Sequence, residues 1–238
     1  TLTFGILRFA NFAHGEIMMT GAFLTWTALE ISKLLLGFYI HPLIACVPAI
    51  FIAISLALSV DRYFYKPFRD SPTIIIVMAS FGMMLIIRSL VQVIWGPNQI
   101  TFVKGIAKPN VLIKDISDSM DIMLLVPSKH LFIILGTVII MLAFNYMLTR
   151  TRIGKAMRAV SDSPDLAKVT GIDVELVIRA TWIVGGFCAV MAGVFMAMDT
   201  QFIMSTMGFR MLLPMFAAAI LGGIGRPFGA VLGGLVIG

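Results

Sequence analysis

The residues of this chain best suited to chemistry lie together near its start, in Asn11-Phe12-Ala13-His14-Gly15-Glu16. This segment brings an amide, an imidazole and a carboxylate directly before the apolar run 17–29. Such groups are costly to desolvate, so beside a hydrocarbon-length segment they usually line a protein interior or a water-filled path. We therefore take Asn11, His14 and Glu16 as candidates for a translocation path or gate.

The same segment also has a structural interpretation. A carboxylate near a helix start, such as Glu16, is favoured by the helix dipole, and Asn11 is a good residue to cap that helix. We expect a cap and hinge here ahead of a proton relay. A metalloprotease is excluded, because the chain has three histidines and no HExxH spacing.

Arg88 is a further candidate, because it lies inside the apolar run 73–95 with Gln92 one helical turn later on the same face. It could contact the carboxylate of a transported solute. We expect instead that it snorkels to the outer interface or pairs with Glu30 or Asp199.

Composition fixes the class of protein that must position these residues. Hydrophobic residues make up 59% and charged residues 13% of the 238 residues, whereas soluble domains carry about 25% charged residues. The chain is therefore an integral membrane protein with room for about six to eight helical crossings. We expect an all-α polytopic bundle forming one transmembrane domain over 1–238, with both ends truncated and a helix missing before Thr1.

Apolar periodicity and length predict where the helices cross. The expected crossings are 17–36, 42–60, 73–95, 129–148 and 177–198, with a short stretch at 211–224 that either spans or re-enters and a seventh helix beginning at 227. The net charge of +6 is a topology signal rather than a nucleic-acid footprint, because the basic residues cluster at the ends of these runs. Their density around 62–69 and 150–179 places those two loops in the cytoplasm. The segment 96–128 is then an external loop, in which 111–116 and 121–126 predict a small hairpin.

The cytoplasmic segment 150–173 is predicted to form two short helices. In the first, Ile153, Ala156, Met157 and Val160 recur at three- and four-residue spacing and give a narrow apolar face on a basic helix.

The second helix has clear boundaries. Ser163 is its N-cap with Pro164 at the first helical position, Gly171 ends it, and Asp173 caps the next crossing. The resulting knob either docks on a soluble subunit that hydrolyses ATP or rests on anionic lipid.

Glycines at helical spacing predict close helix packing in lipid. The candidates are Gly185, Gly193, Gly222, Gly223, Gly225, Gly229 and Gly233. The glycine-rich run at 222–225 lacks the GK[ST] ending of a P-loop, so it does not indicate nucleotide binding.

Three motifs in order give the chain a specific resemblance. NFAHGE, TRIGKAMRAVSDSPDLAKVTGID and AAAILGGIGRPFGAVLGGLVIG together resemble the branched-chain amino-acid ABC transporter permeases of the LivH type. One departure is SDSMDI in the external segment, where a glycine-containing turn is typical of the family. The resemblance implies that the cytoplasmic segment couples to an ATPase, with motif positions at Gly154, Ala156, Arg158, Ala159, Asp165, Ala167 and Gly171.

The resemblance also implies an assembly. It consists of a second permease subunit, two cytoplasmic ATP-binding subunits that hold ATP and Mg, and an external substrate-binding protein. This chain would then carry no cofactor, catalytic residue or metal, bind no nucleic acid, and lie as a multi-pass protein in the lipid bilayer of a bacterial plasma membrane. The expected substrates are leucine, isoleucine and valine.

Other classes of transporter stay open at this point. A permease for urea or another small polar solute shares the architecture, and a predominantly polar path would favour it. A secondary transporter or channel would use His14, Glu16 or Arg88 for coupling or selectivity. An intramembrane enzyme lacks a nucleophile with suitable partners.

Overall fold

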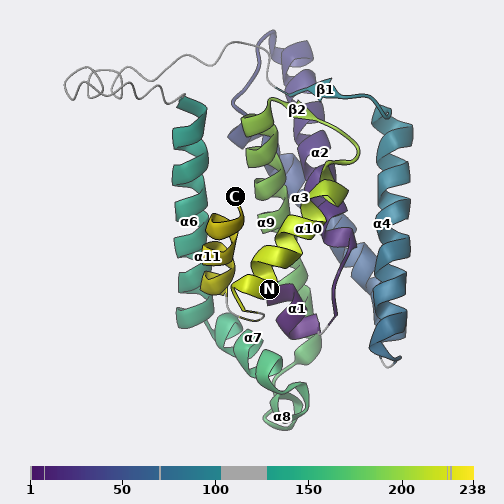
Figure 1. Cartoon of the computed structure of the whole chain (residues 1–238), viewed down its shortest axis with the longest axis vertical. Helices are drawn as coiled ribbons and strands as arrows, with labels where there is room; N and C mark the ends of the chain where they lie inside the picture. The colour runs from purple at the N-terminus through teal and green to yellow at the C-terminus, as the bar shows by residue number, and fades with distance from the viewer. Residues whose placement is uncertain (1, 8, 70, 103–127, 224, 226) are drawn as a thin grey trace, which may run out of the picture.

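The computed structural model describes the chain except for residues 1, 8, 70, 103–127, 224 and 226 (Figure 1). The helices are α1 (Leu2–Leu7), α2 (Ala13–Leu36), α3 (Pro42–Val60), the π-helical turn η1 (Asp61–Tyr65), the 3-10 turn η2 (Lys66–Phe68), α4 (Thr73–Trp95), α6 (Ser128–Arg150), α7 (Arg152–Asp162), α8 (Pro164–Val169), α9 (Val174–Thr200), α10 (Met207–Leu221) and α11 (Pro227–Ile237). Two strands, β1 (Ile100–Thr101) and β2 (Phe202–Ile203), complete the described elements. The predicted polytopic helical bundle is confirmed.

Four of the described helical segments are long and apolar enough to cross a membrane. They are Pro42–Phe68, Thr73–Trp95, Lys129–Arg150 and Val174–Thr200. The 24-residue α2, which contains the predicted crossing 17–36, is about 36 Å long but carries more charge. Its N-terminal half is almost entirely buried, so the most polar long helix lies inside the bundle rather than against lipid.

Helix α2 packs against α3, α4, α9 and α10, and small residues make these contacts close. A Cβ on Gly193 would overlap the backbone carbonyl of Met18, and one on Gly21 would overlap Val190. Gly15 and Gly208 meet where α2 crosses α10, and a Cβ on Gly15 would lie 2.5 Å from the Gly208 carbonyl oxygen. Backbones in lipid can approach this closely only at small residues.

The two ends of the bundle hold different loops (Figure 1). At one end β1 and β2 pair antiparallel, with Ile100 opposite Ile203. The turns η1 and η2 lie at the other end with α7 and α8, because Lys66 and Arg69 bond to Glu175 at the start of α9. The two basic loops therefore share one end of the molecule, as their charge predicts. The expected hairpin at 111–116 and 121–126 falls outside the described residues.

Helices α10 and α11 form a hairpin of short helices. The 15 residues of α10 span about 22 Å, less than the ~30 Å hydrocarbon core. In Figure 1 α10 runs obliquely through the bundle and α11 turns back beside it. The stretch 211–224 thus has the length and reversal of a re-entrant segment.

The glycines around this hairpin divide into two groups. A Cβ on Gly222, Gly229 or Gly233 would overlap backbone of the facing helix, so these three lie at the helix contact. Gly223 and Gly225, expected in helix packing, instead occupy the turn with φ of +88° and +84°. Their contribution is the left-handed backbone that other residues rarely adopt.

Candidate translocation and coupling site

The ends of α7, α8 and α9 are fixed by side-chain caps. Thr151 Oγ1 accepts from the Gly154 amide at 3.0 Å, Ser163 Oγ from Leu166 at 3.4 Å and Asp173 Oδ1 from Leu176 at 3.1 Å. The predicted caps at Ser163 and Asp173 are confirmed. These bonds satisfy backbone donors that a helix start otherwise leaves open.

Helix α8 ends in a Schellman motif. The Ile172 amide donates to the Ala167 carbonyl and the Gly171 amide to the Lys168 carbonyl, each at 3.0 Å. Gly171 has φ +83° and nothing near its Cβ position, so the glycine is required by backbone conformation and not by space.

Helix α7 lies with one face against the membrane helices. Gly154, Met157 and Val160 are buried, and a Cβ on Gly154 would overlap the end of α6 at Met147 and Leu148. Ile153 was predicted on this apolar face, but it is exposed, because Gly154 at the contact turns its neighbour outward. Among the predicted coupling residues Ala156 and Ala159 are half-buried and Arg158 is exposed.

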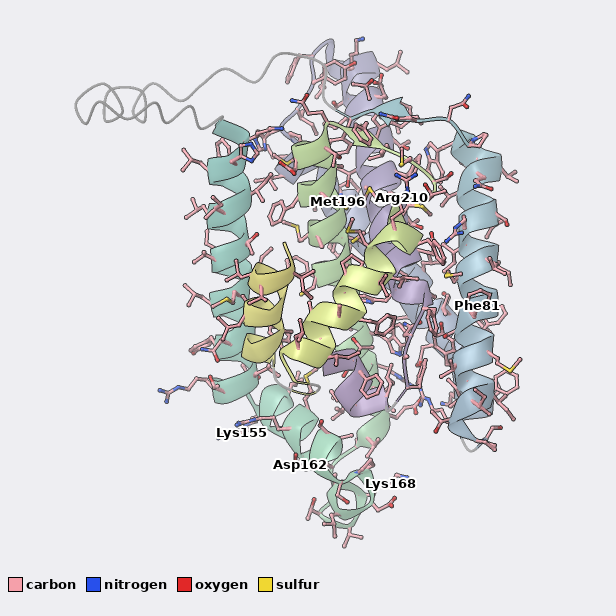
Figure 2. The ribbon with its side chains drawn as sticks, in the orientation of Figure 1. Phe81, Lys155, Asp162, Lys168, Met196 and Arg210 are labelled. Atoms are coloured by element: carbon pink, nitrogen blue, oxygen red, sulfur yellow. The ribbon has the colours of Figure 1, made fainter. Side chains whose placement is uncertain are left out.

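Helix α8 projects farthest from the bundle, and its tip is partly apolar. Leu166 and Val169 are 68% and 85% exposed, while Ala167 beside them is buried. Asp165 and Lys168 are also exposed, and Figure 2 shows Lys168 at this tip with Asp162 and Lys155 along α7. Leu166 and Val169 were not predicted as functional residues. Two large apolar residues three positions apart, in a helix too short to bury them, would have indicated an exposed apolar contact surface.

Ion pairs tie the start of α9 to the turn after α3. Glu175 accepts from Lys66 Nζ at 2.6 Å and from Arg69 Nη1 at 2.7 Å. Arg69 Nη2 also bonds both oxygens of the buried Asp61, at 2.8 and 2.6 Å. Arg69 therefore bridges two carboxylates at the α7–α8 end, one from η1 and one from the first turn of α9.

Tyr65, in the same π-helical turn as Asp61, continues these contacts into the bundle. Its ring stacks on Trp182 with centroids 5.6 Å apart and meets Phe9 edge-on at 5.3 Å. Its hydroxyl donates to Asn11 Oδ1 at 3.0 Å, and the same oxygen accepts from the Ala13 amide at 3.1 Å. Asn11 thus bonds the first residue of α2 from outside the helix, but the N-cap position is Phe12, which makes no side-chain cap bond, so the prediction that Asn11 is the N-cap is wrong.

Asn11 and His14 line a cavity of about 440 Å³ between the start of α2 and the α10–α11 hairpin. Its wall is mainly apolar, with Thr3 as the other polar contributor from α1. A second cavity, of about 850 Å³, opens at the α7–α8 end beside Asp61, Arg69 and Glu175. Gly185, predicted for helix packing, lies in ordinary contact with Thr3 and His14, at 3.5 and 3.8 Å from its Cβ position.

Glu16 and Arg88 form an ion pair inside the bundle. Arg88 Nη2 and Nε lie 2.5 and 3.2 Å from Glu16 Oε1, and the guanidinium carbon sits 4.8 Å from the centroid of the Phe209 ring. We predicted that Arg88 would snorkel to the outer interface or pair with Glu30 or Asp199. Both predictions are wrong, because Arg88 pairs with Glu16. Glu16 is fully buried, so its carboxylate takes the nearest cation instead of capping the helix.

Comparison with known proteins places this arrangement in a family. The family model for the permease component of the branched-chain amino acid transport system matches residues 1–238. The chain belongs to this family. It is therefore a multi-pass membrane component of an ABC transport system, with ATP-binding partner subunits, and not an enzyme.

Relatives within the family match the chain along its whole length. The high-affinity branched-chain amino acid permease LivH of Escherichia coli K12 is 29% identical over all of this chain and 77% of its own length. BraD of Pseudomonas aeruginosa is 28% identical with the same coverage, and a probable LivH of Methanocaldococcus jannaschii is 28% identical over all of this chain and 72% of its own. No solved structure matches the chain significantly.

Proposed function

We propose that this chain is the permease subunit of an ATP-driven importer that carries leucine, isoleucine and valine inward across a bacterial plasma membrane. Its partners are a second permease, two cytoplasmic ATP-binding subunits that bind ATP and Mg, and an external protein that delivers the substrate. The α7–α8 end faces the cytoplasm, following its basic loops. The chain itself supplies the path and the coupling element and needs no cofactor.

The observation that carries this proposal is the α7–α8 knob in a chain matched throughout by the permease family. Both helices are capped, one face of α7 is buried, and the exposed Leu166 and Val169 have no apolar cover. Apolar side chains in a rigid projection favour docking into a groove of another protein. A helix lying on lipid would instead present the apolar face of α7, which is packed inward.

The contacts around the knob suggest how ATP-driven motion reaches the membrane. Displacement of α8 moves the start of α9 through Asp173, and Glu175 carries the motion through Arg69 to the turn with Asp61 and Tyr65. Tyr65 holds Asn11 at the start of α2. The chain itself links α8 to α9 and Asp61 to Tyr65, and the remaining steps are hydrogen bonds or ion pairs, so the elements move together or the bonds break.

The alternative substrates fit less well. A urea permease predicts a predominantly polar path, whereas the cavity beside Asn11 is mainly apolar. A secondary transporter would use His14, Glu16 or Arg88 for coupling, and two of these three, Glu16 and Arg88, are already paired with each other.

The first experiment is affinity purification of the full-length protein in mild detergent, with mass spectrometry of the proteins recovered. We expect an ATP-binding subunit and a second permease. After reconstitution in vesicles with the external binding protein, uptake of labelled leucine should require ATP. A homo-oligomer with no ATPase, stable after gentle crosslinking, would overturn the proposal.

A variant at the knob tests the coupling role. Val169→Asp places a charge where an apolar contact is expected, so recovery of the ATP-binding subunit should fall at least tenfold while the permease stays folded. Lys155→Gln, an exposed change on α7, is the matched control and should leave recovery unchanged. Equal recovery with both variants would assign the docking surface elsewhere.

A further inference from the structure

We propose that the cavity between the start of α2 and the α10–α11 hairpin is the place where the amino acid rests during translocation. This inference depends on the proposed function and adds a site to it. The cavity volume of about 440 Å³ falls within the ~300–1,000 Å³ of small-molecule sites. It lies beside the short helices α10 and α11, and transporters place their substrates beside short or broken helices.

The hairpin side of the cavity suits a branched aliphatic side chain. Leu212, Met215, Phe216, Ala219 and Ile220 of α10 line it. These side chains offer dispersion contacts and no hydrogen bonds, so a solute that is polar throughout loses its water here without compensation. A short aliphatic group is instead stabilised by leaving water.

The opposite side offers hydrogen-bond donors. The Ala13 amide can only donate a hydrogen bond, so the Asn11 side-chain atom that it contacts is the oxygen Oδ1. The Asn11 amide nitrogen is consequently the remaining group; it is buried and has no partner among the described residues. The residue is 7% exposed and lines the cavity beside His14, but the amide nitrogen itself is buried, so Asn11 must move before this group can donate to a substrate carboxylate.

One aromatic residue belongs to the walls of both this cavity and the one at the α7–α8 end. Phe9 lines both the 440 Å³ cavity and the 850 Å³ cavity beside Arg69. It lies outside the described helices, in the connection between α1 and α2. Because Phe9 packs on Tyr65, and Tyr65 bonds Asn11, motion of the η1 turn would shift the donor and this wall together.

The test measures substrate selectivity in vesicles that contain the full transporter and its external binding protein. Ala219→Leu fills the apolar side, so leucine uptake should fall at least fivefold more than valine uptake. Ala217→Leu makes the same change on α10 outside the cavity lining and should preserve the ratio. Asn11→Asp keeps the oxygen that bonds Ala13 and Tyr65 but replaces the amide donor with a second carboxylate oxygen, which repels a substrate carboxylate, so the KM for leucine should rise about tenfold.

Phe216→Ala provides a second size test, since an enlarged cavity should favour leucine over valine relative to the wild type. Selectivity unchanged in all these variants, in vesicles whose wild-type transporter works, would overturn the site and leave the proposed function standing. Wild-type vesicles that take up no branched-chain amino acid would overturn the proposed function and this site with it.

Discussion

Two groups of ion pairs in this protein use the same chemistry in different surroundings. Glu16 and Arg88 pair inside the bundle, where the Glu16 side chain has no exposed surface. At the α7–α8 end, Arg69 and Lys66 share Glu175, whose side chain is 33% exposed. An ion pair in a low-dielectric interior is costly to break, because the remaining charge keeps its desolvation penalty, whereas water replaces a lost partner at the surface.

The difference suggests separate tasks. The Glu16–Arg88 pair joins α2 to α4 with the Glu16 side chain fully buried and the Arg88 side chain 18% exposed, so it favours one fixed arrangement. The Asp61–Arg69–Glu175–Lys66 network joins the η1–η2 turn to the start of α9. Its Lys66 and Glu175 side chains are 50% and 33% exposed while Asp61 is buried, so the bonds to Glu175 can exchange during a transport cycle. We expect the first to matter mainly for stability and the second mainly for coupling.

The largest effect is expected from Glu16→Gln. It leaves the Arg88 guanidinium without a carboxylate and should lower the free energy of unfolding by about 3 kcal/mol. Thermal unfolding in detergent measures the loss. The double variant Glu16→Gln with Arg88→Met should lose less than Glu16→Gln alone, because neither charge then remains unpaired. A double variant as unstable as the sum of its single changes would contradict the pairing.

The next effect is expected from Arg69→Met. Asp61 is buried, with 6% of its side chain exposed, and would lose its cation, at a cost of about 2 kcal/mol. The amount of leucine moved per ATP hydrolysed should fall at least fivefold, since Arg69 no longer links Glu175 of α9 to Asp61 of η1. Arg69→Lys sharpens the test: a point charge cannot bridge two carboxylates as the guanidinium fork does, so its coupling ratio should be intermediate. Full coupling in Arg69→Met would remove the network from the mechanism.

The smallest effect is expected from Lys66→Gln. The Lys66 side chain is 50% exposed and Glu175 keeps Arg69, so after solvent screening the loss should be about 0.5 kcal/mol. It should disappear in 1 M salt, where the Debye length is about 3 Å, whereas the Glu16→Gln defect should persist. If salt changed the stability loss equally in Lys66→Gln and Glu16→Gln, the two groups of ion pairs would not differ in solvent screening, which would contradict this comparison.

Local sequence determined much of the membrane architecture. The crossings follow from apolar length, because a bilayer satisfies no backbone groups and leaves the helix as the simplest solution. The caps at Ser163 and Asp173 and the end of α8 at Gly171 also follow from residues within one helical turn. Asn11 lies one residue too early to be the N-cap of α2, although its side-chain oxygen still bonds the Ala13 amide.

Tertiary structure decided what distant residues do. Glu16 and Arg88 lie 72 positions apart, and several basic residues were available as partners, so only the packing of α2 on α4 selects the pair. Gly223 and Gly225 share the spacing of packing glycines, yet the reversal between α10 and α11 uses them for positive φ. The cavity lined by Asn11 and Phe216 also depends on that reversal. A periodic pattern specifies the face of one helix, whereas the neighbour of that face is set by how all the helices pack.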